Sequence, residues 1–355
     1  MGIVYATEEQ VSTSLEIFNT ARARPIIRQK LAAAALSVEG QLHRRFYPET
    51  RTIKADWPNY SRSPSWEFDL WDNELISTPT ALSSGGTAID VANAIVRRAD
   101  EKLEPPYNIL QLNLDSDVAF AAGPTFQQSL HITGPFGYNA TDTSLASGVL
   151  SGAINSSVTT LVINPSSGNY TVGVGSIVLI GTERLVTTDR RMSDTAINTA
   201  GTLTAQQNSV SLTVTDGTAL AVGETILVES ERMRIDDIAG NVLTVKRAFD
   251  GSVLASHASG LDIYALRTFL AKRGQLGTTA ASHSDADPVY VHDFHPLVNE
   301  LCIAETVTLL EQNSAGYARV IGSGSSSREV KAEGLADIRD RAYQAVGRKL
   351  RSGAI

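Results

Sequence analysis

Apolar residues recur along the chain at two different spacings, and the changes of spacing divide it into segments. Between residues 25 and 46 the spacing is three to four, which predicts a long helix with one buried stripe. A shorter helix is expected to begin after Thr7, because acidic residues and Gln10 fill its first turn, and to end near Asn19. The expected stripe of the long helix comprises Ile27, Leu31, Ala35, Val38, Leu42 and Phe46.

Between residues 50 and 133 the apolar spacing falls to two, which is typical of strands. Turn sequences such as Ser83-Ser84-Gly85-Gly86 separate the apolar runs. We expect a small β-meander that packs on the long helix. Its tryptophans are interpreted as core or subunit-contact residues rather than as a sugar-binding platform. The alternating apolar residues and the tryptophans are Trp57, Trp66, Phe68, Leu70, Trp71, Leu110, Leu112, Leu114, Leu130 and Ile132.

Helical spacing returns near the C-terminus. One helix is expected from Pro296 to Gln312, with Leu297, Leu301, Ala304 and Leu309 on one side. The Gly/Ser sequence of residues 322–327 then predicts a flexible linker. A last helix is expected over residues 330–351, with one apolar stripe formed by Leu335, Ile338, Ala342, Val346 and Leu350.

The most specific pattern is a β-hairpin sequence that occurs twice in the chain. Residues 174–185 and 222–233 match at an offset of 48, each with a turn glycine, an apolar strand and a second strand opening on Glu-Arg. We expect a positive φ at Gly175 or Gly223, the turn glycines. A second signature, Lys-Arg followed by Ala-Ser-His, occurs at residues 246–257 and again 26 residues later.

The two offsets differ, so the repeats are not a simple tandem pair. One unit, B, is continuous over residues 203–264, whereas the other, A, consists of residues 158–189 plus 267–290. We therefore hypothesise that unit B is inserted into unit A. This nesting predicts that the strand near Phe269 pairs with the strand near Val186. A tandem pair with a spare hairpin is the alternative, and it would leave unpaired strand edges.

Composition and charge narrow the class of protein. The 355 residues suffice for two or three domains, and 42% hydrophobic with 19% charged residues is typical of globular proteins. No apolar run approaches the length of a membrane span. The single Cys302 excludes an internal disulfide and indicates a reducing compartment.

Residues 61–327 carry 15 basic and 28 acidic side chains, net −13, whereas residues 328–355 are net +3. Such an acidic body does not attract nucleic acid non-specifically.

Candidate chemistry is sparse. The sequence lacks the common nucleotide-binding, hydrolase and metalloprotease motifs. His292 and His295 have a spacing compatible with metal ligation, but no carboxylate cluster accompanies them, so a surface or capping role is preferred. Two other pairs, His257 with His283 and Glu183 with Glu231, are equivalent members of the repeat. We expect these histidines to stabilise turns, and the glutamates to bond across their hairpins or to face solvent. No enzyme activity, catalytic residue, metal or cofactor is expected.

The order of elements resembles the head-to-tail adaptor (connector) proteins of tailed bacteriophages. The resemblance rests on the helix of residues 25–46, the strands around Trp66, the segment Thr133-Gly134-Pro135-Phe136-Gly137-Tyr138 and the two late helices. Residues 139–292 intervene, which departs from the minimal family pattern. This insert is similar to β repeats of phage virion proteins. Asp250-Gly251-Ser252 and Gly277-Thr278 match the sequence motif of these repeats. At the position where the motif usually has glycine, one unit has Ala248 and the other has Gly274.

The resemblance implies an α+β fold. An adaptor frame of helices and a small β-meander (residues 1–138 and 293–355) would carry an inserted all-β domain (residues 139–292) made of two related units, nested or in tandem. The implied function is a structural virion protein that forms a ring, dodecameric in such adaptors, under the portal at the neck of the virion. The ring would extend the DNA channel, let DNA pass without specific binding, and dock tail or stopper proteins.

The resemblance also implies that the chain assembles in the host cytoplasm, contacts no membrane, and binds the portal through its C-terminal helix. The residues expected at that portal interface are Leu335, Ile338, Arg339, Arg341, Ala342, Val346, Arg348, Lys349, Leu350 and Arg351. The alternative is a carbohydrate-binding or adhesin-type virion protein that uses the β insert as its binding module. A low aromatic content of 6% argues against that alternative.

Overall fold

The chain folds into two compact units of mixed α+β structure with mostly β content. The computed structural model describes residues 2–15, 20, 22–58, 64–100, 104–138, 147–166, 172–314, 320–321, 328–329 and 333–348. The larger unit comprises residues 1–41, 142–275 and 279–346, and the smaller unit residues 42–141, 276–278 and 347–355.

The described helices are α1 (Glu8–Ser14), α2 (Ala23–Leu42), α3 (Pro296–Ser314) and α4 (Glu333–Val346). Helix α1 begins as predicted, because the Thr7 side chain accepts from the Gln10 backbone while the Gln10 side chain accepts from the Thr7 backbone. It ends at Ser14 rather than near Asn19. The predicted buried stripe of residues 27–46 is confirmed, since all six of its side chains are at most 1% exposed.

The two late helices differ in detail from the prediction. The fully buried residues of α3 are Val298, Leu301, Cys302, Glu305 and Thr306, so of the predicted stripe only Leu301 is fully buried. Polar and apolar residues are spread around this helix without one clearly apolar side, so periodicity alone does not select the buried face. Helix α4 packs against α3 and is shorter than the predicted 330–351. The predicted linker lies outside the described residues. On either side of it, β18 (Val320–Ile321) pairs with β19 (Arg328–Glu329).

The smaller unit consists of two antiparallel sheets around a core of its own. Trp57 lies in this core, whereas Trp66 and Trp71 are 40% and 55% exposed, so the tryptophans do not form one buried cluster. Leu114 lies beyond the end of the strand that contains Leu110 and Leu112, and its side chain is exposed. One sheet has the order β1 (Glu49–Ala55), β7 (Leu130–Phe136), β3 (Ala81–Ser84) and β4 (Thr87–Ile89). The other has the order β2 (Glu67–Asp69), β6 (Ile109–Leu112) and β5 (Ala94–Arg97), with a 3₁₀ turn at Val91–Asn93.

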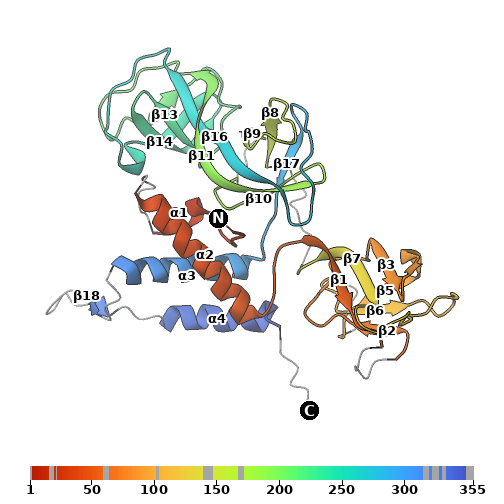
Figure 1. Cartoon of the computed structure of the whole chain (residues 1–355). Coiled ribbons are helices and arrows are strands. Elements are labelled where there is room, and N and C mark those ends of the chain that lie inside the picture. Colours follow the sequence, from red (N-terminus) through yellow and green to blue (C-terminus); the bar gives the residue numbers. More distant parts are fainter. Residues whose placement is uncertain are drawn as a thin grey trace. The chain divides into compact units, whose positions relative to one another are not determined.

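The β region of the larger unit forms one continuous sheet that closes into a six-stranded barrel (Figure 1). We call this barrel the first lobe. It is made of β8 (Gly148–Ser151), β9 (Thr160–Pro165), β10 (Ile177–Ile180), β17 (Pro288–Val291) and the adjoining parts of β11 (Glu183–Asn198) and β16 (Asp262–Gln275).

The remaining strands form what we call the second lobe, at the other ends of β11 and β16. It has the order β16, β13 (Thr225–Val228), β14 (Glu231–Ala239), β15 (Val242–Lys246) and β12 (Ser211–Thr213), with a 3₁₀ turn at Phe249–Gly251. A bridge between Thr199 and Val214 connects β12 back toward β11. Each lobe encloses its own cluster of buried apolar side chains.

Strands β11 and β16 pair along both lobes. Val186 lies opposite Lys272 and Arg190 opposite Phe269 in the first lobe, and Ile197 lies opposite Ile263 in the second. The pairing near Phe269 is the one that the nested arrangement predicts. Between these paired stretches, residues 199–261 leave the ribbon and return to it.

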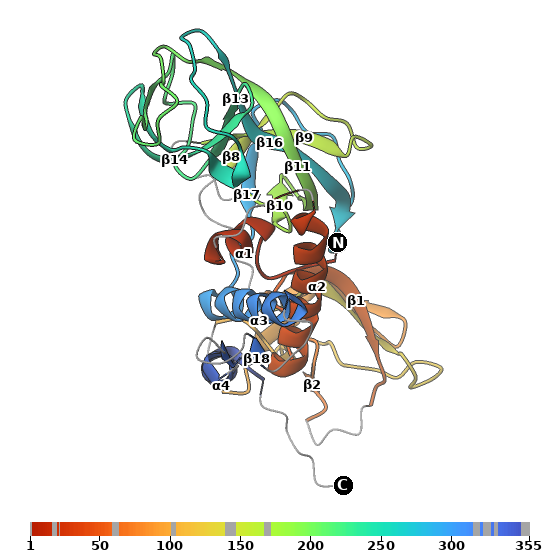
Figure 2. The same cartoon turned by 90° about the vertical axis from the view of Figure 1, so that its left-hand side faces the viewer.

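Helices α1 and α2 lie directly against the first lobe (Figure 2). The Glu8 backbone N–H donates to the Val174 carbonyl at 3.0 Å, and the Val174 N–H donates to the Glu9 carboxylate at 2.8 Å. Arg28 of α2 binds Asp189 of β11 at 2.7 Å. These bonds place helices and barrel in one compact unit. The chain therefore divides differently from the sequence-based domains, in which helices and meander formed one frame and residues 139–292 a separate module.

Candidate functional site

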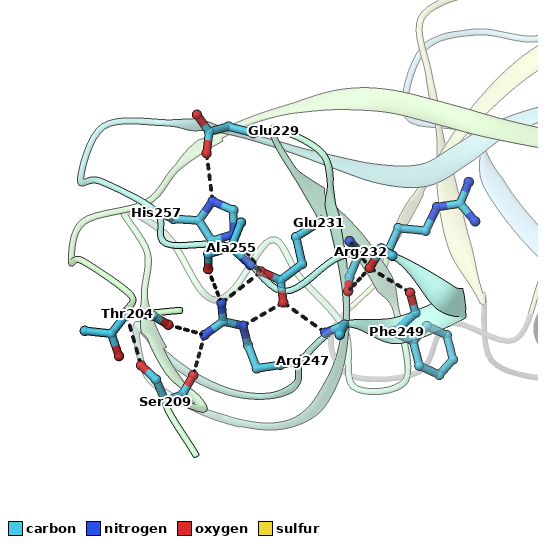
Figure 3. Close-up of polar contacts among 11 residues, drawn as sticks. Thr204, Ser209, Glu229, Glu231, Arg232, Arg247, Phe249, Ala255 and His257 are labelled. Carbon is cyan, nitrogen blue, oxygen red and sulfur yellow. Dashed lines mark hydrogen bonds and ion pairs between the residues drawn. The ribbon is translucent and has the colours of Figure 1, made fainter. Parts of the chain in front are cut away.

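Each lobe holds a buried cluster of one glutamate, one arginine and one histidine. In the second lobe Glu231 begins β14, Arg247 follows β15, and His257 lies in the next loop. The Arg247 Nε and Nη2 atoms each lie 2.8 Å from a Glu231 carboxylate oxygen, and the His257 Nε2 lies 2.9 Å from Oε2 (Figure 3). The backbone N–H groups of Ala248 and Ala255 also donate to this carboxylate, at 2.9 and 3.0 Å.

Arg247 also connects the cluster to its surrounding loops. Its Nη1 donates to the carbonyls of Thr204 and Ser209 at 3.1 and 2.8 Å, and its Nη2 donates to the carbonyl of Ala255 (Figure 3). A planar guanidinium presents five N–H donors. In Arg247 the Nε and Nη2 atoms bind the Glu231 carboxylate, and the remaining N–H groups donate to backbone carbonyls. The cluster therefore fixes loops that the β ladder does not reach.

The first lobe repeats this arrangement with Glu183, Arg273 and His283. Arg273 Nε and Nη2 lie 2.8 and 2.7 Å from the Glu183 carboxylate, and His283 Nε2 lies 2.8 Å from it. Arg273 Nη1 donates to the carbonyls of Asn155 and Val158. Glu183 comes from the first half of unit A, whereas its two partners come from the second half.

The geometry assigns the two clusters a structural role. Burial of Glu183 and Glu231 would raise the pKa of each carboxyl, but hydrogen bonds from arginine, backbone N–H and histidine outweigh burial and lower the pKa to about 2. A carboxylate that is ionised well below neutral pH and saturated with donors is a poor general acid or base. Both glutamates are fully buried, so the expectation that they might face solvent is wrong. The histidines hydrogen-bond within the clusters, as a turn-stabilising role requires.

The two clusters differ on one side of the histidine. His257 Nδ1 lies 2.9 Å from the carboxylate of Glu229, a residue with a φ of 54°. The residue equivalent to Glu229 in the first lobe is Gly181, with a φ of 58°. There the nearest acidic group to His283 Nδ1 is Asp287, at 3.9 Å.

The backbone beside each arginine explains the usual glycine of the repeat. Gly274 follows Arg273 with a φ of 56°, and Ala248 follows Arg247 with a φ of 51°. Both lie in the left-handed region, which costs little for glycine and more for alanine. The prediction for the turn glycines is also confirmed, because Gly175 and Gly223 have φ values of 101° and 85°.

The other chemically reactive side chains do not converge. His292 is buried with its ring edge on Phe294, at a centroid distance of 4.9 Å, and His295 is half-buried. Among the residues that the structure describes, no group of three or more His, Cys, Asp or Glu side chains is arranged to hold a metal ion. Burial raises the pKa of the Cys302 thiol to about 12, so this thiol is protonated at neutral pH.

The residues expected at a portal interface are distributed between core and surface. Leu335, Ala342 and Val346 are buried within the larger unit, and Ile338 is half-buried. Three of the four described residues of the sequence-based stripe are thus covered by the chain itself. Lys349, Leu350 and Arg351 lie outside the described residues.

The three remaining arginines of that set have partners in the chain. Arg339 donates to Glu305 of α3 at 2.7 Å, and the same carboxylate accepts from Gln41 of α2 at 3.0 Å. Glu305 therefore links three helices. Arg341 is exposed, 3.7 Å from Glu300. Arg348, in the smaller unit, pairs with Asp72.

The structure reveals a surface that the sequence analysis did not single out, the outer face of α2. Its exposed residues are spaced as one helical face and carry no charge, and Leu36 is 71% exposed. The signal was present in the sequence, because α2 has apolar residues outside the predicted stripe. The face comprises Pro25, Ile26, Gln29, Ala33, Leu36 and Gly40.

Comparison of the chain with protein-family models, with curated proteins and with solved structures gives no match in any of the three. None of the described helices is long and apolar enough to cross a membrane.

Proposed function

We propose that this chain is the subunit of a head-to-tail adaptor ring of a tailed bacteriophage. In this proposal the ring lies under the portal, extends the DNA channel and docks tail or stopper proteins. The resemblance of the sequence to the adaptor family suggests this class of protein. The acidic body, net −13 over residues 61–327, suits a channel along which DNA slides without binding.

The observation that carries the proposal is the uncharged outer face of α2. A surface helix ordinarily shows charged residues opposite its buried stripe. Here Ile26 and Leu36 are exposed on that side, with Ala33 between them and Gly40 beyond. Small residues allow close approach of another helix. A face of this kind is suited to contact with a neighbouring subunit.

Portal docking by the C-terminal helix is the second part of the proposal. Because Leu335, Ala342 and Val346 are buried against the chain's own helices, docking would use either the outward side of α4 or a rearranged α4. The outward side carries Asp337, Asp340 and Arg341, a polar surface suited to a reversible protein contact.

We also infer that the β region consists of two related units, one inserted into the other. Three independent features support this: the Glu183 cluster joins the two halves of unit A, the pairing of β11 with β16 joins the same halves, and the equivalent Glu231 cluster lies wholly within unit B. Matching hydrogen bonds extend to the loops, where Ile154 exchanges backbone bonds with His283 as Leu203 does with His257.

The test of the ring uses negative-stain imaging of the purified chain mixed with the portal protein of its own virus. The expected result is rings stacked coaxially on portals. Leu36→Glu should abolish the rings, because it buries a charge in the proposed subunit contact. Leu114→Glu is the matched control, since Leu114 is a similarly exposed leucine, at 67%, in the smaller unit. Leu36→Glu protein that forms normal rings would contradict the proposed contact.

Portal docking is tested separately by truncation after Gly324, which removes α4. Truncation also removes the buried Leu335, Ala342 and Val346, so circular dichroism first establishes whether the truncated chain folds. On the docking hypothesis, a folded truncated chain does not sediment with portals. A truncated chain that folds and joins the portal normally would exclude α4 from docking. If the truncated chain unfolds, docking is tested by Asp337→Lys combined with Asp340→Lys on the outward side of α4. This variant should fold and not sediment with portals, and normal sedimentation would contradict docking through that side.

A further inference from the structure

A cleft with a volume of about 670 Å³ lies between α1 and the second lobe. The α1 wall includes Gln10, Thr13 and Ser14, and the opposite wall includes Arg234, Lys246 and Phe249. Small-molecule sites typically have volumes of about 300–1,000 Å³ and combine apolar walls with a few polar groups. The volume of this cleft falls within that range, but most of its lining residues are polar or charged, which favours a charged ligand.

Two cations stand side by side on the strand wall. The register places Arg234 directly opposite Lys246 on the neighbouring strand, and Thr225 directly opposite Arg234 on the other side. Like charges directly opposite each other on a sheet repel and destabilise it. The pair is notable in a chain whose net charge is −8. An anion between the two side chains would relieve this repulsion.

The two cations of this pair differ in their surroundings. The Arg234 guanidinium lies over the Phe249 ring, 5.4 Å from its centroid, and donates to Asp236 at 2.9 Å. Asp236 offsets part of the charge of Arg234 at an exposed position. Lys246 is exposed to the cleft.

The acidic residues of the cleft wall are bound to other cations. Glu9 pairs with Arg190 at 2.8 Å, and Glu224 with Arg267 at 2.6 Å. The Asp250 carboxylate lies 3.5 Å from Arg232. These carboxylates therefore have arginine partners of their own.

The first lobe shows that the barrel does not require polar residues at these strand positions. The residues 48 positions before Thr225 and Arg234 are Ile177 and Val186, both 1% exposed. In the first lobe this surface is covered by the chain, whereas in the second lobe it lines the cleft. Thr225 and Arg234 are thus polar only in the second lobe, whereas the lysine of the row belongs to the repeat, because Lys272 is the equivalent of Lys246 in the first lobe.

We propose that this cleft binds a small molecule that carries a phosphate group. Arg234 and Lys246 donate to the phosphate oxygens, the Thr225 hydroxyl completes the row, and Phe249 contacts the remainder of the ligand. The site is independent of the adaptor function proposed above.

The test is an NMR titration of the full chain with sodium phosphate and with sodium pyrophosphate, at constant ionic strength set by sodium chloride. Saturable shifts are expected at the backbone amides of Thr225, Arg234 and Lys246. Arg234→Gln combined with Lys246→Gln should weaken binding about tenfold or more, because it removes two charge-assisted hydrogen bonds.

Lys272→Gln is the matched control, because Lys272 occupies the position of Lys246 in the first lobe. It should change the dissociation constant less than about twofold. Shifts that do not saturate, or that persist in a folded double variant, would overturn the proposal. A short DNA duplex that binds through the same two residues, while phosphate and pyrophosphate do not, would also overturn it in favour of a nucleic-acid contact.

Discussion

The carboxylate of Glu231 and the guanidinium of Arg247 form a two-point ion pair, and neither side chain is exposed to solvent. The pair joins the beginning of β14 to the end of β15, and through Arg247 it reaches two loops. Taking two charges out of water is costly, and only dense hydrogen bonding offsets that cost. Here every polar edge of the pair meets a partner, so the cluster determines the loop geometry of its lobe.

Removal of one member of this pair should be strongly destabilising. Glu231→Ala leaves the Arg247 charge buried and is expected to lower the free energy of unfolding of the larger unit by about 3–5 kcal/mol. Urea denaturation followed by circular dichroism measures the change. As a control in the same unit, Glu300→Ala removes the exposed partner of Arg341 and should cost less than about 1 kcal/mol. A loss below that value for Glu231→Ala would show that the pair is dispensable.

The clusters also predict the response to acid. The folded-state pKa of Glu183 and Glu231 is lowered from 4.5 to about 2, so each contributes stability that is present above pH 4.5 and lost as the pH falls toward 2. The thermal midpoint of the larger unit should therefore fall across this window. In Glu231→Gln the fall should be shallower, since one of the titrating groups is absent. Parallel curves for wild type and variant would contradict this assignment.

The backbone beside the two arginines predicts opposite effects for two substitutions. Ala248→Gly relieves a left-handed alanine and is expected to raise the free energy of unfolding by about 0.5 kcal/mol, the strain relieved exceeding the added chain entropy. Gly274→Ala introduces the same strain and should lower it by about 1 kcal/mol. Each substitution is thus the control for the other. Changes of the same sign in both would refute the argument from φ.

The thiol of Cys302 should resist modification in the folded protein. It is fully buried on α3 and its pKa is raised to about 12, so the reactive thiolate is scarce at neutral pH. A chromogenic thiol reagent should react slowly with the native chain and rapidly, with one equivalent, in denaturant. Rapid reaction under native conditions would indicate that α3 opens readily.

Much of the local structure follows from the sequence. The Thr7 cap and the buried stripe of α2 were predictable, because capping and helical periodicity act within a few residues. The hairpins that contain Gly175 and Gly223 were predictable because the same sequence pattern occurs in both. Repetition also marked the glutamates and histidines as equivalent.

What escaped prediction depends on distant partners. Equivalence of Glu183 and Glu231 says nothing about burial, and the arginine that neutralises Glu183 lies 90 residues further along the chain. The length of α4 and the buried face of α3 depend on packing between helices, and the polar and apolar residues of α3 are too mixed around the helix for periodicity to decide. The exposed face of α2 was not predicted, because helical periodicity indicates which side of a helix is buried and not what the opposite side contacts.

The continuous strands β11 and β16 have a mechanical consequence. Tension applied along them would load their interstrand hydrogen bonds in shear, all at once, rather than opening them one after another. Neither lobe can be pulled away along that direction without rupturing a ribbon that belongs to both. The β region should thus behave as a single stiff element under load and yield abruptly.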